Sequence, residues 1–236
     1  MNDRIAHDNK TLVDFWNAAF ALTDEERAGM MNEAPESPEC LAPSPKLYAA
    51  ACALGKRKKV IDLGCGQGWA AIAAAKAGCP DVTAADPAPN AASAAELCAN
   101  AFGVGSRVHA VAMPDGWLGT VPDGEYDGLI SVNVLDTVPP ETSRELIREA
   151  ARIVSADADV VIGLNYYLSP EAAAERNIPL GDGGEMYLDG VLRLVSRSDG
   201  EWEALFKPYF SVESLGYYSW PGETKETRRL FRLKKK

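Results

Sequence analysis

The sequence predicts an α/β fold: a doubly wound, mostly parallel seven-stranded sheet with an N-terminal helical extension and a C-terminal antiparallel hairpin. From residue 59, short apolar runs alternate with alanine-rich helical stretches, the pattern of parallel strands joined by crossover helices. The first run leads into three alternating glycines, and two late segments alternate polar and apolar residues as antiparallel strands do. With 236 residues and 47% hydrophobic content, the chain can bury one core with additions.

The alternating elements occupy residues 57–167 and predict a Rossmann-like core. Apolar residues recur at helical spacing between the apolar runs, so each run is expected to be followed by a helix on one face of the sheet. Strands are expected at 60–63, 82–85, 108–112, 128–132 and 160–164, and helices at 70–77, 88–102 and 141–154.

Residues 1–56 are expected to form a helical cap. Thr11 and Asp14 predict a capping box that begins an amphipathic helix, with Phe15 and Trp16 on its apolar side. These two rings either pack in the core, which the spacing favours, or close over a ligand. Four prolines in 32–45 indicate a loop, after which Ser44 and a first-turn proline begin a helix to about residue 55.

Residues 168–236 are expected to add a lid and the closing hairpin. Two prolines and three glycines in 169–184 interrupt the strand and helix pattern. Ser198 and Glu201 predict a capping box for a helix through residue 207, and 211–219 and 226–233 read as strands. The basic residues of the last strand, Arg228 and Arg229 among them, are interpreted as a solvated face.

Composition excludes several classes of function. A formal charge of -10 disfavours nucleic acid as a partner, because that affinity comes largely from Lys and Arg. Five cysteines without a CxxC pair and only two histidines predict no metal site. No apolar run approaches the roughly 18 residues needed to span a bilayer. An odd cysteine count and no apolar N-terminal segment favour a cytoplasmic location.

The glycine-rich turn at 60–69 is the most informative segment. An apolar strand containing Asp62 runs into Gly64, Cys65, Gly66 and Gly68 and then into a helix. Glycines let a ligand approach bare backbone, and a helix N-terminus favours a carboxylate or phosphate. A nicotinamide fingerprint would need a small residue at position 69, where Trp69 stands.

This DxGxGxG pattern resembles motif I of the class I S-adenosylmethionine-dependent methyltransferases, with quinone-biosynthesis enzymes as the nearest branch. The resemblance implies that Asp62 holds the methionine amino group and that the glycine loop, Cys65 included, cradles the same end of the cofactor. Asp86, followed by Pro87, ends the next strand, where a carboxylate can accept both ribose hydroxyls; an acid there is shared with nicotinamide folds.

Two further segments bear on the resemblance. Residues 126–136 are similar to the family's fourth-strand motif, which implies that Asn133 lies beside the methionine portion. Many family members carry an acid at the end of the third strand that binds the adenine amino group, but this chain has Met113 and Pro114 there. Asp115 is expected to substitute from the loop, and Met113 to cover the adenine face.

Methyl transfer from a sulfonium needs alignment and dehydration more than acid or metal assistance. The candidates for a general base or for acceptor alignment are Asp136 after the fourth strand and Tyr166 and Tyr167 after the fifth, since ligands bind beyond the carboxyl ends of parallel strands. A capping role for Asp136 and packing roles for the tyrosines are the alternatives.

A small-molecule acceptor is expected for two reasons. The chain is acidic, and residues 133–136 lack the Asn-Pro-Pro-Tyr type of motif that amino-methylating enzymes of nucleic acids and proteins carry. Aromatic residues of the last third suggest an apolar or planar acceptor. The alternative function is a regulatory protein that binds the cofactor without transferring its methyl group; an NAD-linked oxidoreductase is disfavoured by Trp69.

Overall fold

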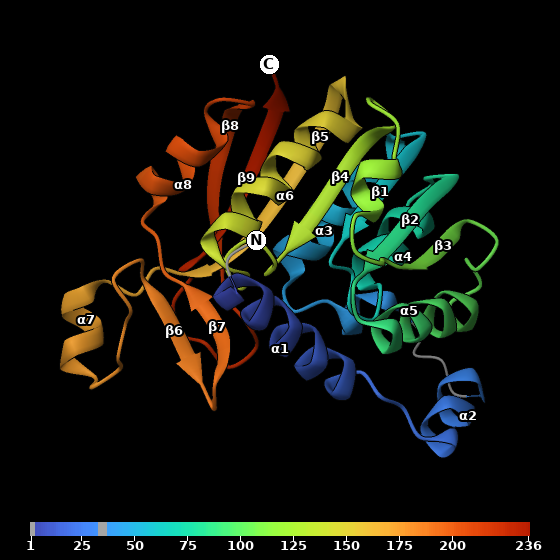
Figure 1. Cartoon of the computed structure of the whole chain (residues 1–236). Helices are drawn as coiled ribbons and strands as arrows, with labels where there is room; N and C mark the ends of the chain where they lie inside the picture. Colours follow the sequence, from blue (N-terminus) through green and yellow to red (C-terminus); the bar gives the residue numbers. More distant parts are fainter. Residues whose placement is uncertain (1–2, 33–36) are drawn as a thin grey trace.

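A seven-stranded sheet in the order β3-β2-β1-β4-β5-β9-β8 runs through the computed structural model, which describes residues 3–32 and 37–236 (Figure 1). Strands β1 to β5 are parallel, and β9 runs antiparallel to both β5 and β8. The strands are β1 Lys59–Leu63, β2 Asp81–Asp86, β3 Val108–Ala112, β4 Tyr126–Val132, β5 Val154–Tyr166, β8 Phe210–Tyr218 and β9 Arg228–Lys235. The predicted doubly wound sheet with a C-terminal hairpin is confirmed.

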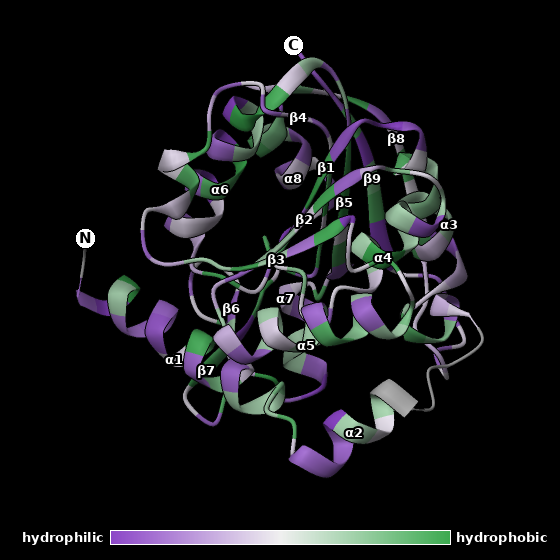
Figure 2. Ribbon diagram, turned by 90° about the vertical axis from the view of Figure 1, so that its right-hand side faces the viewer, coloured by the Kyte–Doolittle hydropathy of each residue, from purple (hydrophilic) through white to green (hydrophobic). Residues whose placement is uncertain are grey.

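Helices cover both faces of this sheet, as the turned view of Figure 2 shows, with α6 on one side and α3 and α4 on the other. One face is covered by α3 Pro45–Ala53, α4 Trp69–Lys76 and α5 Pro89–Ala101. The opposite face is covered by α6 Pro140–Ile153 and α8 Asp199–Phe206. Six consecutive residues of α4, from Ala70 to Ala75, are buried, and five of them are alanines. Such small side chains let the helix lie close to β1, which positions the loop between them.

The N-terminal cap comprises α1 Asp3–Ala19, α2 Asp24–Asn32, η1 Pro38–Leu41, α3 and η2 Leu54–Lys56. The prediction that the first helix begins at Thr11 is wrong, because α1 begins at Asp3 and the Thr11 hydroxyl donates to the carbonyl of Asp8 within the helix. A capping-box pattern is a local signal, whereas contacts of the first turns with the rest of the fold extend this helix. The predicted cap of α3 is confirmed, since the Ser44 hydroxyl accepts the Lys46 N–H.

Residues 168–195 contain α7 Pro170–Glu175 and a separate antiparallel hairpin of β6 Glu185–Leu188 and β7 Val191–Val195. This hairpin was not expected from the sequence. Its turn is Asp189-Gly190, both with positive φ, which is a recognised hairpin signal between two apolar runs. The helix α8 begins with the predicted capping box of Ser198 and Glu201.

The hairpin β6-β7 packs against α1. The Tyr187 hydroxyl donates to the Asp8 carboxylate at 2.9 Å, and the guanidinium of Arg193 lies 3.7 Å from the centre of the Phe15 ring. The cap and the hairpin therefore meet at the carboxyl edge of the parallel strands. No helix in residues 3–32 and 37–236 is long and apolar enough to cross a membrane.

The prediction that the basic residues of the last strand face solvent is wrong for Arg228 and Arg229. Arg228 is 5% exposed and Arg229 is 1% exposed. The strand β9 lies between β5 and β8 rather than at the edge of the sheet, and its first four residues are all buried, so both faces of its first half are covered. Two guanidinium groups are consequently buried next to the ends of β5 and β8.

Candidate active site

The glycine loop joins β1 to α4 at the carboxyl edge of the sheet. Gly64, Gly66 and Gly68 have φ of 74°, 53° and 78°, a left-handed conformation that other residues adopt only with strain. A Cβ on Gly64 would also lie 2.2 Å from a methyl group of Val134. The loop is therefore built from backbone alone at these three positions.

Hydrogen bonds to β2 hold this loop in place. The N–H groups of Gly64 and Cys65 both donate to the Ala85 carbonyl, at 2.8 and 3.2 Å. The Cys65 side chain points into the core, and burial raises the pKa of its thiol. Cys65 thus presents main chain, not sulfur, to the site.

Asp86 at the end of β2 connects the loop to the next crossover. One carboxylate oxygen accepts the Gly66 N–H at 2.9 Å, and the other accepts the Ala88 N–H at 2.9 Å. An ionised carboxylate offers about four acceptor sites, so both oxygens retain capacity for ligand hydroxyls. Burial raises the pKa of Asp86, which is 7% exposed, while the following Pro87 is exposed.

Asp62 in β1 is buried beneath the same loop. Its carboxylate accepts the N–H of Ala71 in the first turn of α4 at 3.1 Å. Burial, with a smaller contribution from the charge of Asp86, raises the pKa of Asp62 to about 7 against the opposing effect of that hydrogen bond. An ammonium group bound here would favour the ionised carboxylate.

The ring of Phe20, in the cap, covers the glycine loop. A Cβ on Gly66 would lie 2.9 Å from the tip of this ring, and Trp16 stacks on Phe20 with centroids 5.8 Å apart. The cap is held nearby, since Asn90 donates two hydrogen bonds to Asn17: its main-chain N–H to the side-chain oxygen at 2.9 Å and its side-chain amide to the main-chain carbonyl at 2.8 Å. Phe15 and Trp16 were the two rings that the sequence offered as a possible cover for a ligand. The ring that lies over the loop is instead Phe20, one helical turn after Trp16.

Met113 and Asn133 come from the ends of the strands on either side of β2 and β1. The Met113 N–H donates to the Asp86 carbonyl at 2.9 Å, which places Met113 beside Asp86. Asn133 follows β4 with φ of 56°, and its side-chain oxygen accepts the Tyr218 hydroxyl at 3.3 Å. Such left-handed residues are often found at functional sites.

The acceptor-side candidates occupy different environments. Asp136 is fully buried; one oxygen accepts the Asn165 N–H at 2.6 Å, and the other has no partner within the described residues. Burial raises the pKa of Asp136. Tyr166 is half-buried with the Arg228 guanidinium 5.7 Å from its ring centre, and Tyr167 is 43% exposed beside a cavity.

The structure thus gathers most of the predicted cofactor residues and separates others. Asp62, the glycine loop, Asp86 and Met113 form one connected group at the ends of β1, β2 and β3. Asp115 lies apart, exposed in the loop before η3 Trp117–Thr120. Asp136, Tyr166 and Tyr167 lie around the end of β5, on the other side of β4.

Comparisons with known proteins agree with this geometry. Residues 60–157 match the family model of the methyltransferase domain, a stretch that includes the glycine loop, Asp86 and Asn133. This match agrees with the resemblance of the glycine loop to the class I S-adenosylmethionine-dependent methyltransferases. The finer resemblance to quinone-biosynthesis enzymes stays a prediction. Comparison with curated proteins gives no match.

Solved structures share the fold over almost the whole chain. Magnesium protoporphyrin IX methyltransferase from Synechocystis PCC 6803, with bound S-adenosylhomocysteine, is 16% identical, with a TM-score of 0.67 over 97% of this chain and 100% of that one. The 1,6-didemethyltoxoflavin-N1-methyltransferase from Burkholderia thailandensis, with its acceptor and S-adenosylhomocysteine bound, is 16% identical, with a TM-score of 0.64 over 98% and 89%. Mitomycin 7-O-methyltransferase is 18% identical, with a TM-score of 0.60 over 97% and 68%.

Proposed function

We propose that this protein transfers the methyl group of S-adenosylmethionine to a small-molecule acceptor. The observation that carries the proposal is the Asp86 carboxylate, which clamps the Gly66 N–H of a side-chain-free loop and keeps acceptor capacity on both oxygens. The methyltransferase domain match and the small acceptors named for neighbouring structures support it.

The residues present fit this cofactor. In the proposal, Asp62 accepts from the methionine ammonium, the backbone of Gly64 to Gly68 lies against the methionine end, and Asp86 accepts from the ribose hydroxyls. Met113, beside Asp86, packs on the adenine, and Asn133 lies beside the methionine portion. Cys65 contributes its main chain to the loop, and Pro87 follows Asp86, whereas the exposed Asp115 is given no contact with the cofactor. Bound in this place, S-adenosylmethionine supplies an electrophilic methyl group on a positively charged sulfur.

In the proposal, the protein accelerates methyl transfer by aligning the donor with the acceptor and by excluding water from the site. Orientation of reactants can supply about 7 to 11 kcal/mol of barrier reduction. The Phe20 ring over the loop, and the hydrogen bonds of Asn17 to Asn90, hold an apolar cover above the donor site. Because Asp136 is fully buried and accepts the Asn165 N–H, its role in the proposal is to position the chain after β5. Tyr167 is exposed, so it is the candidate that can contact an acceptor.

A transfer assay tests this function. The full-length protein is incubated with S-adenosylmethionine tritiated on the methyl group and a panel of small aromatic and heterocyclic acids, amines and phenols. We expect label in one class of acceptor and stoichiometric S-adenosylhomocysteine. Binding of S-adenosylhomocysteine with no transfer to any class would instead support the regulatory alternative.

A further inference from the structure

Asn133 lies in the turn after β4, directly beside the glycine loop. Its main-chain N–H donates to the Gly163 carbonyl of β5 at 2.8 Å. A methyl group of the next residue, Val134, would lie 2.2 Å from a Cβ on Gly64. The φ of Asn133 is 56°, a left-handed conformation that asparagine adopts more readily than most residues other than glycine. These contacts hold Asn133 next to the place where the methionine end of the donor is proposed to lie.

Tyr218, the last residue of β8, contacts the oxygen of the Asn133 side-chain amide. The tyrosine is fully buried, and its hydroxyl donates to this oxygen at 3.3 Å and to the Leu164 carbonyl at 3.3 Å. A tyrosine hydroxyl has a single hydrogen, so the two oxygens share it. Burial raises the pKa of Tyr218 well above its ordinary value, so the hydroxyl stays protonated and remains a donor.

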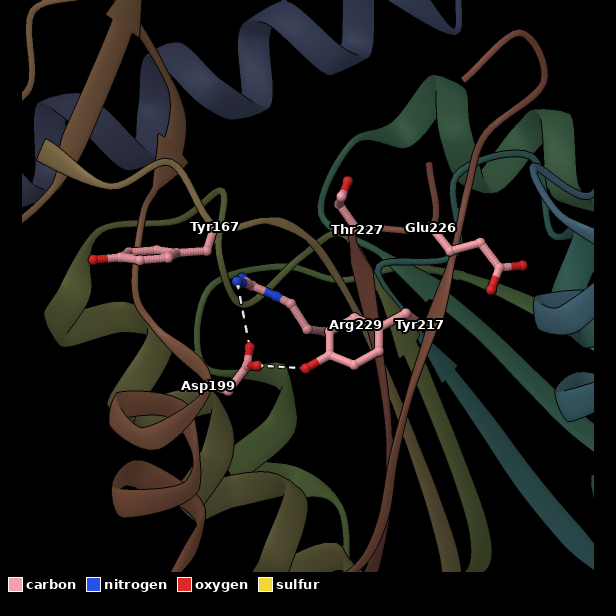
Figure 3. Close-up of a pocket in the computed structure, with 6 residues that line it drawn as sticks. All are labelled: Tyr167, Asp199, Tyr217, Glu226, Thr227 and Arg229. Carbon is pink, nitrogen blue, oxygen red and sulfur yellow. Dashed lines mark hydrogen bonds and ion pairs between the residues drawn. The ribbon is translucent and has the colours of Figure 1, made fainter. Parts of the chain in front are cut away.

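The neighbouring residue Tyr217 lies on the other face of the sheet. Successive side chains of a strand point to opposite faces. Tyr217 points toward a cavity of about 280 Å³, where its hydroxyl donates to Asp199, the first residue of α8, at 2.6 Å (Figure 3). Tyr218 belongs instead to the core that contains residues of α3 and α4. Of the two tyrosines, only Tyr218 reaches Asn133.

The nitrogen of the Asn133 amide remains available to a ligand. In the described part of the chain it donates to no protein group, and it is not one of the side-chain atoms that are both buried and without a partner. The nitrogen of this half-buried side chain therefore has accessible surface beside the glycine loop. An amide nitrogen carries two hydrogens, which suit the oxygens of a carboxylate.

We propose that Tyr218 is a positioning residue of the donor site: its hydroxyl holds the oxygen of the Asn133 amide, so that the amide nitrogen donates to the carboxylate at the amino-acid end of the cofactor. This inference rests on the proposed function, and it gives the last hairpin of the chain a part in donor binding. Without the hydroxyl, the amide is free to turn over and present its oxygen, which repels a carboxylate.

Two ligands separate a positioning role from a structural one. S-Adenosylhomocysteine has the amino-acid end, whereas 5′-methylthioadenosine lacks it and keeps the adenosine. In calorimetric titrations of the full chain, Tyr218→Phe should weaken S-adenosylhomocysteine binding about three- to tenfold and leave 5′-methylthioadenosine binding unchanged. An equal loss for both ligands would show a structural role and overturn the proposal.

Tyr126→Phe is the matched control. It removes another buried tyrosine hydroxyl, which donates to the Thr83 hydroxyl at 3.1 Å from the first residue of β4, at the opposite edge of the sheet. Its cost in stability should be similar, but neither ligand should bind more weakly. A loss of S-adenosylhomocysteine affinity equal to that of Tyr218→Phe would contradict a specific role for Tyr218.

Variants of Asn133 keep the test decisive if Tyr218→Phe does not fold. Asn133→Asp retains an oxygen for Tyr218 and tolerates the positive φ but loses the N–H donors, so S-adenosylhomocysteine should bind about tenfold or more weakly. Wild-type affinity in Asn133→Asp overturns the proposal, because the amide nitrogen would then face Tyr218 rather than the ligand. Asn133→Gly removes the amide, and adding Tyr218→Phe to it should cost no further affinity; a further loss also overturns the proposal.

The wild-type titration separates this inference from the proposed function. If the wild-type chain does not bind S-adenosylhomocysteine, the proposed function is refuted and the role of Tyr218 with it. If the wild-type chain binds and Tyr218→Phe binds equally well, only the role of Tyr218 is refuted.

Discussion

Asp86 holds the loop and, in the proposed function, also binds the ligand. Each oxygen accepts one main-chain N–H, from Gly66 and from Ala88, which fixes the plane of the carboxylate. Burial raises its pKa, while the hydrogen bonds from the Ala88 and Gly66 N–H groups oppose that rise. A fixed, partly satisfied acceptor of this kind is suited to a pair of hydroxyl groups.

Asp86→Asn should weaken S-adenosylhomocysteine binding. Hydrogen bonds to charged groups contribute about 1.5 to 3 kcal/mol, which corresponds to roughly 10- to 150-fold in affinity. The measurement is calorimetric titration, with Asp81→Asn at the start of the same strand as the matched control. An unchanged affinity in Asp86→Asn would remove Asp86 from the donor site.

Local pattern correctly predicted the backbone around Asp62, Asp86 and the glycines, because adjacent residues determine each strand, turn and helix there. Arg229 shows the opposite case. Alternation with apolar residues in β9 predicted a solvated face, but the position of β9 between β5 and β8 buries this residue. Strand order is a property of distant segments, so no local pattern carries it.

The helix α1 and the hairpin β6-β7 form the cover of the carboxyl edge. They are joined to each other through Asp8 and Tyr187, and α1 is joined to α5 through Asn17 and Asn90. This arrangement places Phe20 above the glycine loop. Segments more than 170 residues apart in the chain thus close one side of the candidate site.

Asn90→Ala should loosen this cover. It removes a side-chain hydrogen bond to the Asn17 carbonyl, worth about 0.5 to 1.5 kcal/mol, so S-adenosylhomocysteine should bind up to roughly tenfold more weakly. Hydrogen exchange of α1 should be faster in the variant with ligand bound. Glu96→Ala, on the exposed side of α5, is the control. Identical exchange in both variants would contradict a role for this contact.

Elements with a strong local period were predicted well, and those stabilised by distant contacts were not. The strands β1 to β4 and the helices α4 to α6 follow apolar patterns that the sequence displays directly. The start of α1 and the hairpin β6-β7 depend on their mutual packing. The register of β6 with β7 is also irregular at Met186 and Tyr187, which obscures the alternation of a strand.

Buried carboxylates give the whole molecule an unusual response to pH. Burial raises the pKa of Asp62 to about 7 and also raises those of Asp86 and Asp136. An unfolded aspartate has a pKa of about 3.9, so the folded chain holds more protons at Asp62 than the unfolded chain does between about pH 4 and 7. The contribution of Asp62 to stability is complete below pH 4 and is lost as the pH rises through 7.

Asp62→Asn should reduce the fall in unfolding free energy between pH 5 and pH 7 in the ligand-free protein. The amide cannot ionise, and its oxygen can still accept the Ala71 N–H. Urea unfolding at the two pH values measures the difference, with the exposed Asp182→Asn as control. The same fall in wild type and Asp62→Asn would contradict the raised pKa.

Calorimetric titration of S-adenosylhomocysteine into the wild-type protein and Gly66→Ala tests the donor site most directly. Gly66 has φ of 53°, and a Cβ there would lie 2.9 Å from the Phe20 ring. A left-handed residue other than glycine costs about 1 to 2 kcal/mol. We predict one bound ligand per wild-type chain and an affinity reduced about tenfold or more in the variant. No binding to the wild type, or equal affinity in the two proteins, would contradict a cofactor site at this loop.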